Sequence, residues 1–199
     1  MTNELLVRKI LEQAQHYDWS IQGFGMLRLY LSREVRLHVW DSRYQVDNVS
    51  IVHDHPVDLT SKIISGEIRD TQWEPFSGTG GGGINLWQTE IVCGENAVAY
   101  QDGAPTLVEM VGGTKWYRAG DVYTVPKGKL HHSEFRDGTV TLVKRSNRDE
   151  GAAGDRARSL WPEELGPEGW VSAKPRKATR SEVLEITQYA LEVWGDGPV

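Results

Sequence analysis

The pattern of hydrophobic residues changes twice along the chain and divides it into a helical start, a β-rich middle and a helical end. In 4–17, Leu6, Ile10, Ala14 and Tyr17 recur at helical spacing among polar residues, which predicts an amphipathic helix. From about 24 to 146 the apolar runs are short or alternating, which is typical of strands. The expected strands are 26–31, 35–40, 49–52, 59–68, 85–92, 97–100, 106–111, 115–118, 121–125, 132–135 and 139–144.

Glycine-containing turns separate many of these runs. Asp102-Gly103, Gly112-Gly113 and Asp137-Gly138 each lie between apolar runs, as hairpin turns do. The glycine-rich stretch 77–83 predicts a flexible loop, and it lacks the Lys-Ser/Thr that follows a phosphate-binding loop. Many short strands joined by such turns predict an all-β barrel or jelly roll.

The end of the chain combines an irregular stretch with a second helix. Residues 147–178 are rich in Gly, Pro and charged side chains, which predicts an irregular connection over the surface. Thr179 and Glu182 have the spacing of a capping box, and an apolar stripe follows at Val183, Ile186, Ala190 and Val193. We expect the terminal helices to cover an outer sheet face or to form a contact in a homodimer. The whole of 1–199 is expected to be a single domain.

Composition and charge narrow the range of partners. The chain has 199 residues and a formal net charge of −6. Since it has no long basic run, nucleic acid and anionic membranes are not expected partners. The only cysteine is Cys93, so no internal disulfide can form, and we expect a cytoplasmic protein. The first residues lack the pattern of a signal peptide, and no apolar run reaches the roughly 18 to 20 residues of a membrane span.

Three histidines form a candidate metal site. His53 and His55 are two residues apart, so both point to the same face of a strand. His131 follows the turn formed by Pro126, Lys127 and Gly128. Neutral imidazoles suit a divalent transition metal such as iron, nickel, copper, zinc or manganese. The sequence therefore predicts one metal ion held by His53, His55 and His131.

These fragments resemble the two motifs of the cupin family. The second motif is Gly, five residues, Pro, one residue, Gly, two residues, His, which Gly120, Pro126, Gly128 and His131 match. The first motif is His-x-His, three or four residues, Glu, six residues, Gly. His53, His55 and Gly66 match it, but Leu59 stands at the Glu position. The resemblance covers roughly 45–145 and implies a cupin-type jelly-roll barrel with a metal in it.

The replacement of Glu by Leu59 implies a site with three histidines and no carboxylate. Such a site resembles that of the cysteine and thiol dioxygenases, which bind Fe(II) and leave positions open for thiolate and O₂. Arg28 lies about 25 residues before the first ligand, where cysteine dioxygenase carries an arginine that anchors the substrate carboxylate. The chain departs from that group because 141–146 has no tyrosine after the third histidine, and Cys93 is not beside the first motif.

Other candidate site residues follow from strand alternation. Lys62 and Tyr123, together with Arg28, are the candidate catalytic residues, and both are expected to face the pocket. His38 lies between Leu37 and Val39, so it is expected to face away from both, toward solvent. Asp54 is expected to brace the loop between the histidines. Asp58 and Thr60 are candidates to contact a ligand histidine, which the sequence does not settle.

Three functions remain open at this stage. The leading interpretation is an Fe(II) dioxygenase that acts on a small anionic substrate such as a thiol acid. The second is a zinc- or nickel-dependent isomerase, lyase or hydrolase. The third is a cupin that binds a small ligand without catalysis, because fold similarity supports the metal better than the reaction.

Overall fold

The computed structural model describes residues 2–47, 52–76, 78, 82–93, 98–148, 155–165 and 174–195. Its helices are α1 (Asn3–Glu12), η1 (Ala14–His16), η2 (Glu163–Leu165) and α2 (Arg180–Gly195). Its strands are β1 (Ser20–Gln22), β2 (Phe24–Tyr30), β3 (Val35–Gln45), β4 (Val52–His53), β5 (Asp58–Ser65), β6 (Glu67–Pro75), β7 (Ile84–Cys93), β8 (Val98–Arg118), β9 (Val122–Val125), β10 (Leu130–Phe135), β11 (Val140–Ser146), β12 (Asp155–Pro162) and β13 (Arg176–Lys177).

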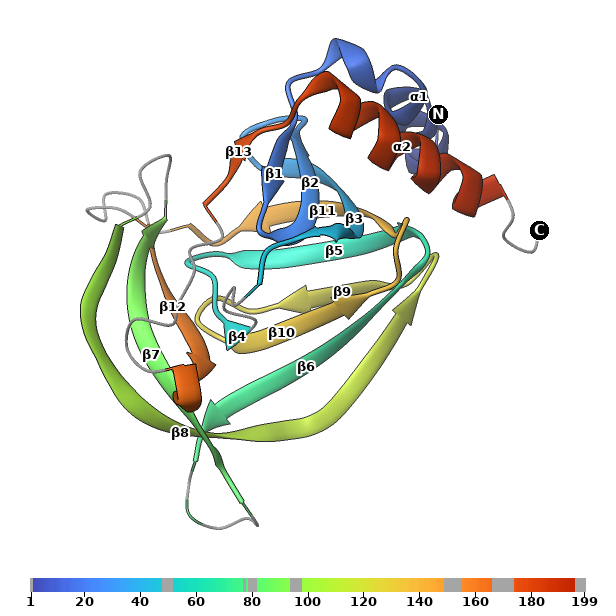
Figure 1. Cartoon of the computed structure of the whole chain (residues 1–199). Coiled ribbons are helices and arrows are strands. Elements are labelled where there is room, and N and C mark those ends of the chain that lie inside the picture. The colour runs from blue at the N-terminus through green and yellow to red at the C-terminus, as the bar shows by residue number, and fades with distance from the viewer. Residues whose placement is uncertain are drawn as a thin grey trace.

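The strands form two antiparallel sheets (Figure 1). One sheet has the order β13-β1-β2-β3-β11-β5-β9, and the other closes on itself in the order β10-β4-β12-β7-β8-β6. The predicted all-β fold with a helix near each end is confirmed. None of the helices in the described ranges has the length and apolar character that a membrane crossing requires.

Helices α1 and α2 pack together on the outer side of the first sheet, the one that runs from β13 to β9, as Figure 1 shows. The predicted capping box is present at the start of α2. The Thr179 backbone N–H donates to the Glu182 carboxylate over 2.8 Å, and the Glu182 N–H donates to the Thr179 hydroxyl over 3.3 Å. The apolar stripes of both helices bury against the sheet; they consist of Val7, Ile10, Leu11, Val183, Ile186 and Ala190.

Strand alternation gives this sheet two buried faces of different character. On β2 and β3, Leu27, Leu29, Leu37 and Val39 point toward the helices and join their apolar core. The residues between them point the other way and line a cavity inside the barrel. The apolar face of the sheet is therefore its outer face, and the more polar face is the inner one.

Gly66 allows the chain to pass from one sheet to the other. The expected strand 59–68 is in fact two strands, since β5 pairs with β9 and β11 whereas β6 pairs with β8 and β10. Gly66, between them, has a φ of +79°, and a Cβ atom there would lie 2.3 Å from the Thr139 hydroxyl oxygen. Both the backbone conformation and the available space therefore require glycine at this motif position.

Two of the predicted hairpin turns are wrong. Asp102-Gly103 and Gly112-Gly113 lie inside the single long strand β8. Gly112 and Gly113 have positive φ, and the β6–β8 register shifts beside them, so they form an irregularity in the ladder rather than a turn. The turn at Asp137-Gly138 is confirmed, because it joins β10 to β11.

The prediction that 147–178 is an irregular connection is also wrong in part. This segment supplies β12, which pairs with β4 and β7 in the closed sheet, and β13, which pairs with β1. The apolar positions of β12, Leu160 and Trp161, are almost fully buried. Most of the expected loop at 77–83 and of the expected strand at 49–52, together with the side chain of Cys93, lies outside the described residues.

Candidate metal centre

The three predicted histidines meet inside the barrel. His53 ends β4, His55 follows it by two residues, and His131 lies in β10 directly opposite His53 in the ladder. One nitrogen from each ring lies within 4.8 Å of the others. Within the described ranges, no Asp, Glu or Cys atom joins this group. Leu59 lines the same cavity, at the position where the cupin motif carries Glu.

The spacing and the donor set fit a transition metal. The Nε2 atoms of His55 and His131 are 3.0 Å apart. Two imidazole ligands of one ion, each about 2.1 Å from it, place their nitrogens at about this separation when they are roughly at right angles. Burial, together with His53 and His131, holds the pKa of His55 well below its usual value. The neutral ring keeps a lone pair that a metal can accept.

Asp70 fixes the orientation of His131. Its carboxylate lies 2.7 Å from His131 Nδ1 and also accepts a hydrogen bond from the Ser133 hydroxyl over 3.1 Å. Both Asp70 and His131 are about 95% buried or more. A proton on Nδ1 shared with Asp70 leaves the Nε2 lone pair facing the other two histidines, which is the usual support of a metal-binding imidazole.

Sequence reasoning missed Asp70 because its strand was predicted to end at 68. Asp70 on β6 pairs with Ser133 on β10. Ser133 is two residues from His131, so both point to the same face of β10. Ile68, two residues earlier, is 1% exposed. An acid on the same strand face as a buried isoleucine was the available signal.

Asp54 and Arg158 join the two cupin-like motifs. The Asp54 carboxylate accepts hydrogen bonds from the Arg158 backbone N–H and Nε, both over 2.6 Å. The Arg158 guanidinium also donates to the Gly128 carbonyl over 2.6 Å, and the Gly128 N–H donates to the His55 carbonyl over 2.9 Å. Asp54 therefore braces the loop as expected, through an arginine of β12 that the sequence did not single out.

Neither of the two residues expected within reach of a ligand histidine contacts one by a hydrogen bond. The Asp58 carboxylate accepts from the Lys127 backbone N–H over 2.7 Å and so holds the turn before His131. The Thr60 hydroxyl lies 3.0 Å from that of Thr124 on the neighbouring strand. These contacts shape the turn and the strand pair.

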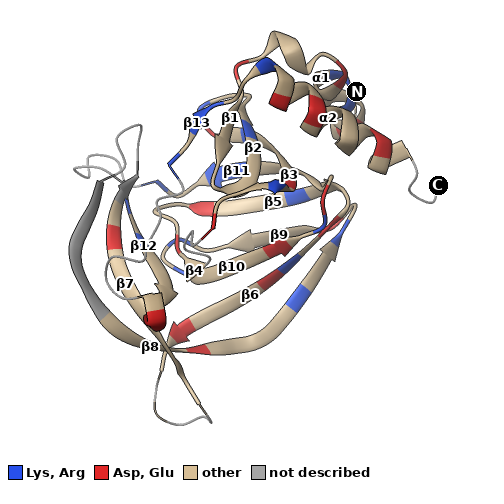
Figure 2. Cartoon of the chain, viewed as in Figure 1, with Lys and Arg blue, Asp and Glu red and all other residues tan. Residues whose placement is uncertain are grey.

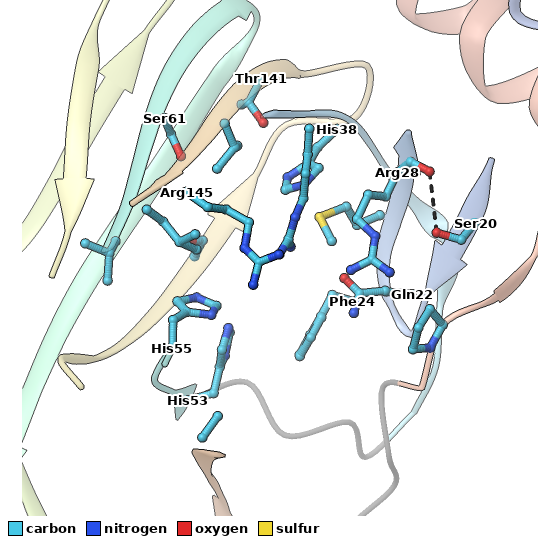
Figure 3. Close-up of a pocket in the computed structure, with 18 of the residues that line it drawn as sticks. Ser20, Gln22, Phe24, Arg28, His38, His53, His55, Ser61, Thr141 and Arg145 are labelled. Atoms are coloured by element: carbon cyan, nitrogen blue, oxygen red, sulfur yellow. Dashed lines mark hydrogen bonds between the residues drawn. The ribbon is translucent and has the colours of Figure 1, made fainter. Parts of the chain in front are cut away.

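A cavity of about 780 Å³ extends from the three histidines along the inner face of the first sheet. Phe24 stacks on His53 with ring centroids 5.0 Å apart, and Trp40 contacts Phe135 at 4.9 Å, so part of the wall is aromatic. Figure 3 shows Arg28, His38 and Arg145 pointing into the space beside His53 and His55. The cavity is of the size that holds a small organic molecule.

Basic side chains dominate the charge of the cavity wall. The lining includes Arg28, Arg36, Arg145, Arg148, Lys174, Arg176 and Lys177. Among the described residues, the acidic ones in this lining are Asp18, which pairs with Lys177 over 3.1 Å, and Asp54, which pairs with Arg158. Figure 2 shows Lys and Arg positions in blue on β13, β2 and β11, strands that contribute to this wall. The cavity therefore favours an anionic ligand.

The prediction that His38 faces solvent is wrong. His38 points away from Leu37 and Val39 as expected, but the helices cover those two residues, so the opposite face is the inside of the barrel. It is 6% exposed. Burial, followed by the charges of Arg36 and Arg28, lowers the pKa of His38 well below its usual value. Its ring is therefore neutral, and it does not belong to the metal cluster.

Of the three other predicted site residues, Arg28 and Tyr123 line the cavity and Lys62 does not. The Lys62 side chain points to the opposite face of β5 from those of Leu59 and Ser61. Its ammonium group binds the Glu4 carboxylate of α1 over 2.6 Å. The expectation that Lys62 faces the cavity is therefore corrected: on β5 the odd-numbered positions face inward.

Tyr123 lies on the same side of the barrel as the Asp70 carboxylate. Its ring stacks on Tyr117 with centroids 4.3 Å apart, and its hydroxyl forms hydrogen bonds with Ser61 and Ser133. Burial and the charge of Asp70 raise the pKa of Tyr123, so the phenol stays protonated. Ser133 links this phenol to Asp70 and hence to His131.

Comparison with known proteins does not identify a relative by sequence. No protein-family model matches the chain, and no curated protein matches it. Among solved structures, hydroquinone 1,2-dioxygenase from Sphingomonas sp. TTNP3, determined with 4-hydroxybenzoate bound, has 13% identity and a TM-score of 0.33, over 59% of this chain and 62% of that chain. Protein SO0799 from Shewanella oneidensis has 14% identity and a TM-score of 0.29, over 97% of this chain and 96% of that chain. At these values neither similarity bears on activity, and the chemistry rests on the three-histidine site itself.

Proposed function

We propose that this protein is an Fe(II)-dependent dioxygenase that acts on a small anionic substrate such as a thiol acid. The observation that carries the proposal is the group of three histidines, with no carboxylate among the described residues, at the end of a basic cavity. His53, His55 and His131 would hold the ion. Bound there, iron would supply open coordination positions and the redox chemistry that oxygenation needs.

The protein contributes orientation and charge. Asp70 holds His131 with its Nε2 lone pair toward the site. Three neutral ligands leave the full charge of the ion in place, and the basic wall adds to it, so an anionic substrate is attracted. We assign Arg28 the role of holding the substrate's carboxylate. We assign Tyr123, through Ser133 and Asp70, the role of fixing the position of His131.

Metal analysis and oxygen uptake test the proposal. The full chain should bind one equivalent of Fe(II), and the iron-loaded protein should consume O₂ with small thiol acids such as cysteine or 3-mercaptopropionate. His131→Ala should abolish both properties, whereas His16→Ala, which removes an exposed histidine of η1, should leave both unchanged. Iron binding without O₂ uptake across thiols and diketones would contradict the proposal.

The second candidate is a zinc- or nickel-dependent isomerase, lyase or hydrolase. The observation that favours it is the ligand set, because three histidines with an open fourth position also form catalytic zinc sites. Protein purified without added metal would then contain zinc or nickel. Activity that persists in the zinc form without O₂ would support this candidate over the dioxygenase.

A further inference from the structure

Three aromatic side chains, Phe24, Trp40 and Phe135, form one part of the cavity lining, which we call the aromatic wall. Phe24 stacks on the predicted ligand His53, with ring centroids 5.0 Å apart and ring planes 18° apart. Phe135 lies against Trp40, with centroids 4.9 Å apart and planes 35° apart. Figure 3 shows Phe24 beside His53, in the space that the histidines face. The aromatic wall therefore begins at the candidate metal centre itself.

A glycine at a strand irregularity brings the two ring pairs together. The register of β2 against β3 shifts between Phe24 and Met26, and Gly25 between them has a φ of +76°. A Cβ atom at Gly25 would lie 2.6 Å from the Asp41 carbonyl oxygen and 3.3 Å from Cζ of Phe135. The Phe135 ring thus packs on the backbone directly after Phe24, where a larger residue would displace it. The three rings consequently form one continuous surface.

The chain holds Trp40 in place and uses its polar atoms. Its backbone N–H donates to the Thr139 carbonyl over 2.9 Å, and its carbonyl accepts from the Gly138 N–H over 2.8 Å. Its indole N–H donates to the Thr141 hydroxyl oxygen over 3.4 Å. The two phenylalanine side chains have no polar atoms. The aromatic wall therefore offers a ligand only the faces and edges of rings, and it recognises shape and π surface.

The rings of the wall leave part of their surface to the cavity. Phe24, Trp40 and Phe135 are each half-buried and line the same cavity. Aromatic groups prefer to pack against one another offset or edge to face, and such pairs gain more than their buried area alone provides. A flat ring placed on this wall makes those contacts, whereas a saturated ring of the same size does not. The wall is therefore selective for a planar group.

We propose that the cavity binds an organic anion that carries an aromatic ring, with the ring against Phe24, Trp40 and Phe135 and close to His53. The basic residues of the cavity attract its anionic end. A volume of about 780 Å³ lies in the range that holds drug-sized molecules, which are larger than a three-carbon thiol acid. That this anion is the substrate rests on the proposed function. Under that function the substrate would be an aryl-substituted thiol acid such as 2-mercapto-3-phenylpropionate.

A pair of acids that differ only in the ring tests the proposal. The probes are 3-phenylpropionate and 3-cyclohexylpropionate, which have the same chain and charge. Calorimetry measures their binding to the full chain, once after treatment with a chelator and once after loading with Zn(II). The phenyl acid should bind about 3- to 10-fold tighter than the cyclohexyl acid in at least one of these forms. A cavity that is merely apolar would favour the cyclohexyl acid, because that acid has the larger apolar surface.

Substitutions in the wall assign the preference to its rings. Phe24→Leu, Trp40→Leu and Phe135→Leu keep an apolar side chain, and each should reduce the preference for the phenyl acid by about 3- to 10-fold. Both acids are measured on the same variant, so a loss of folded protein weakens both equally and leaves their ratio unchanged. Trp116→Leu is the matched control, because Trp116 is 55% exposed on β8 and is not among the lining residues. It should leave the ratio as in wild type.

Three results would overturn the proposal: neither acid binds in either form, the cyclohexyl acid binds as tightly as the phenyl acid in both, or all three wall variants keep the wild-type ratio. These measurements need no O₂, so their failure is distinct from that of the proposed reaction. Oxygen uptake with 3-mercaptopropionate but without a preference for the phenyl acid would overturn the aromatic ligand and leave the dioxygenase standing. A preference for the phenyl acid without oxygen uptake from any thiol would do the reverse.

Discussion

Replacing Asp70 should weaken metal binding more than it disturbs the fold. Asp70 is 3% exposed, lies 2.7 Å from His131 Nδ1 and is also bound by Ser133. Asp70→Asn keeps an acceptor oxygen and removes the charge, so we expect it to reduce Zn(II) or Co(II) affinity about tenfold. Asp70→Leu also removes the acceptor, and we expect a loss of about 100-fold, which is about 2.8 kcal/mol. It should also cost about 1–3 kcal/mol of stability, because the buried donors of His131 and Ser133 lose their partner.

A competition titration against a chromophoric chelator measures these affinities, and the visible spectrum of the Co(II) form reports the coordination geometry. Asp41→Asn is the matched control, because Asp41 is 1% exposed and is paired with Arg43 rather than with a histidine. It should lower stability and leave metal affinity unchanged. Wild-type affinity in Asp70→Leu, or an equal loss of affinity in Asp41→Asn, would refute the role of Asp70 at the metal.

The other predictions concern the barrel and the terminal helix. Gly66→Ala should destabilise the protein by more than about 2 kcal/mol in denaturant titrations, because positive φ and a close contact combine there; Gly120→Ala, with positive φ and open space, should cost about 1 kcal/mol, and equal losses would contradict this account. Arg176 lowers the pKa of Glu182 from 4.5 to about 2, so the contribution of this carboxylate to stability is complete above pH 4.5 and is lost as the pH falls from 4.5 to 2. The difference in melting temperature between wild type and Glu182→Gln should shrink over that range; a constant difference would show that the ion pair is not its source. Leu59→Glu should place a carboxylate beside the three histidines and tighten Co(II) binding, and an unchanged Co(II) spectrum would show that position 59 does not reach the ion.

Sequence signals predicted the cluster of three histidines and the cap of the last helix correctly. The histidines were found from the fixed spacing of two motifs, although they meet only through the pairing of β4 with β10. The capping box before Val183 is complete within four residues. For this cap the physical cause of the structure lies within one segment, so the sequence alone is sufficient.

The errors arose where the outcome depended on which elements pack together. Alternation correctly placed His38 opposite Leu37 and Val39, yet it could not tell that the apolar side would be covered by helices. The same ambiguity affected Lys62, which belongs to the helix-covered side and pairs with Glu4. A period of two residues separates the faces of a strand, but only the tertiary packing decides which face is inside.

The supporting residues Asp70 and Arg158 illustrate a stronger limit. Each acts on a histidine motif from a strand distant in sequence, and the strand register alone brings them together. Their hydrogen bonds fix the orientation of the histidine motifs, which the three histidines by themselves do not do. Asp70 determines which nitrogen of His131 faces the site, and Arg158 links Asp54 to Gly128 and so connects the two motifs. The cluster of His53, His55 and His131, which comes from β4, the segment after it and β10, is thus supported by residues of two further strands, and the closed sheet brings all four strands together.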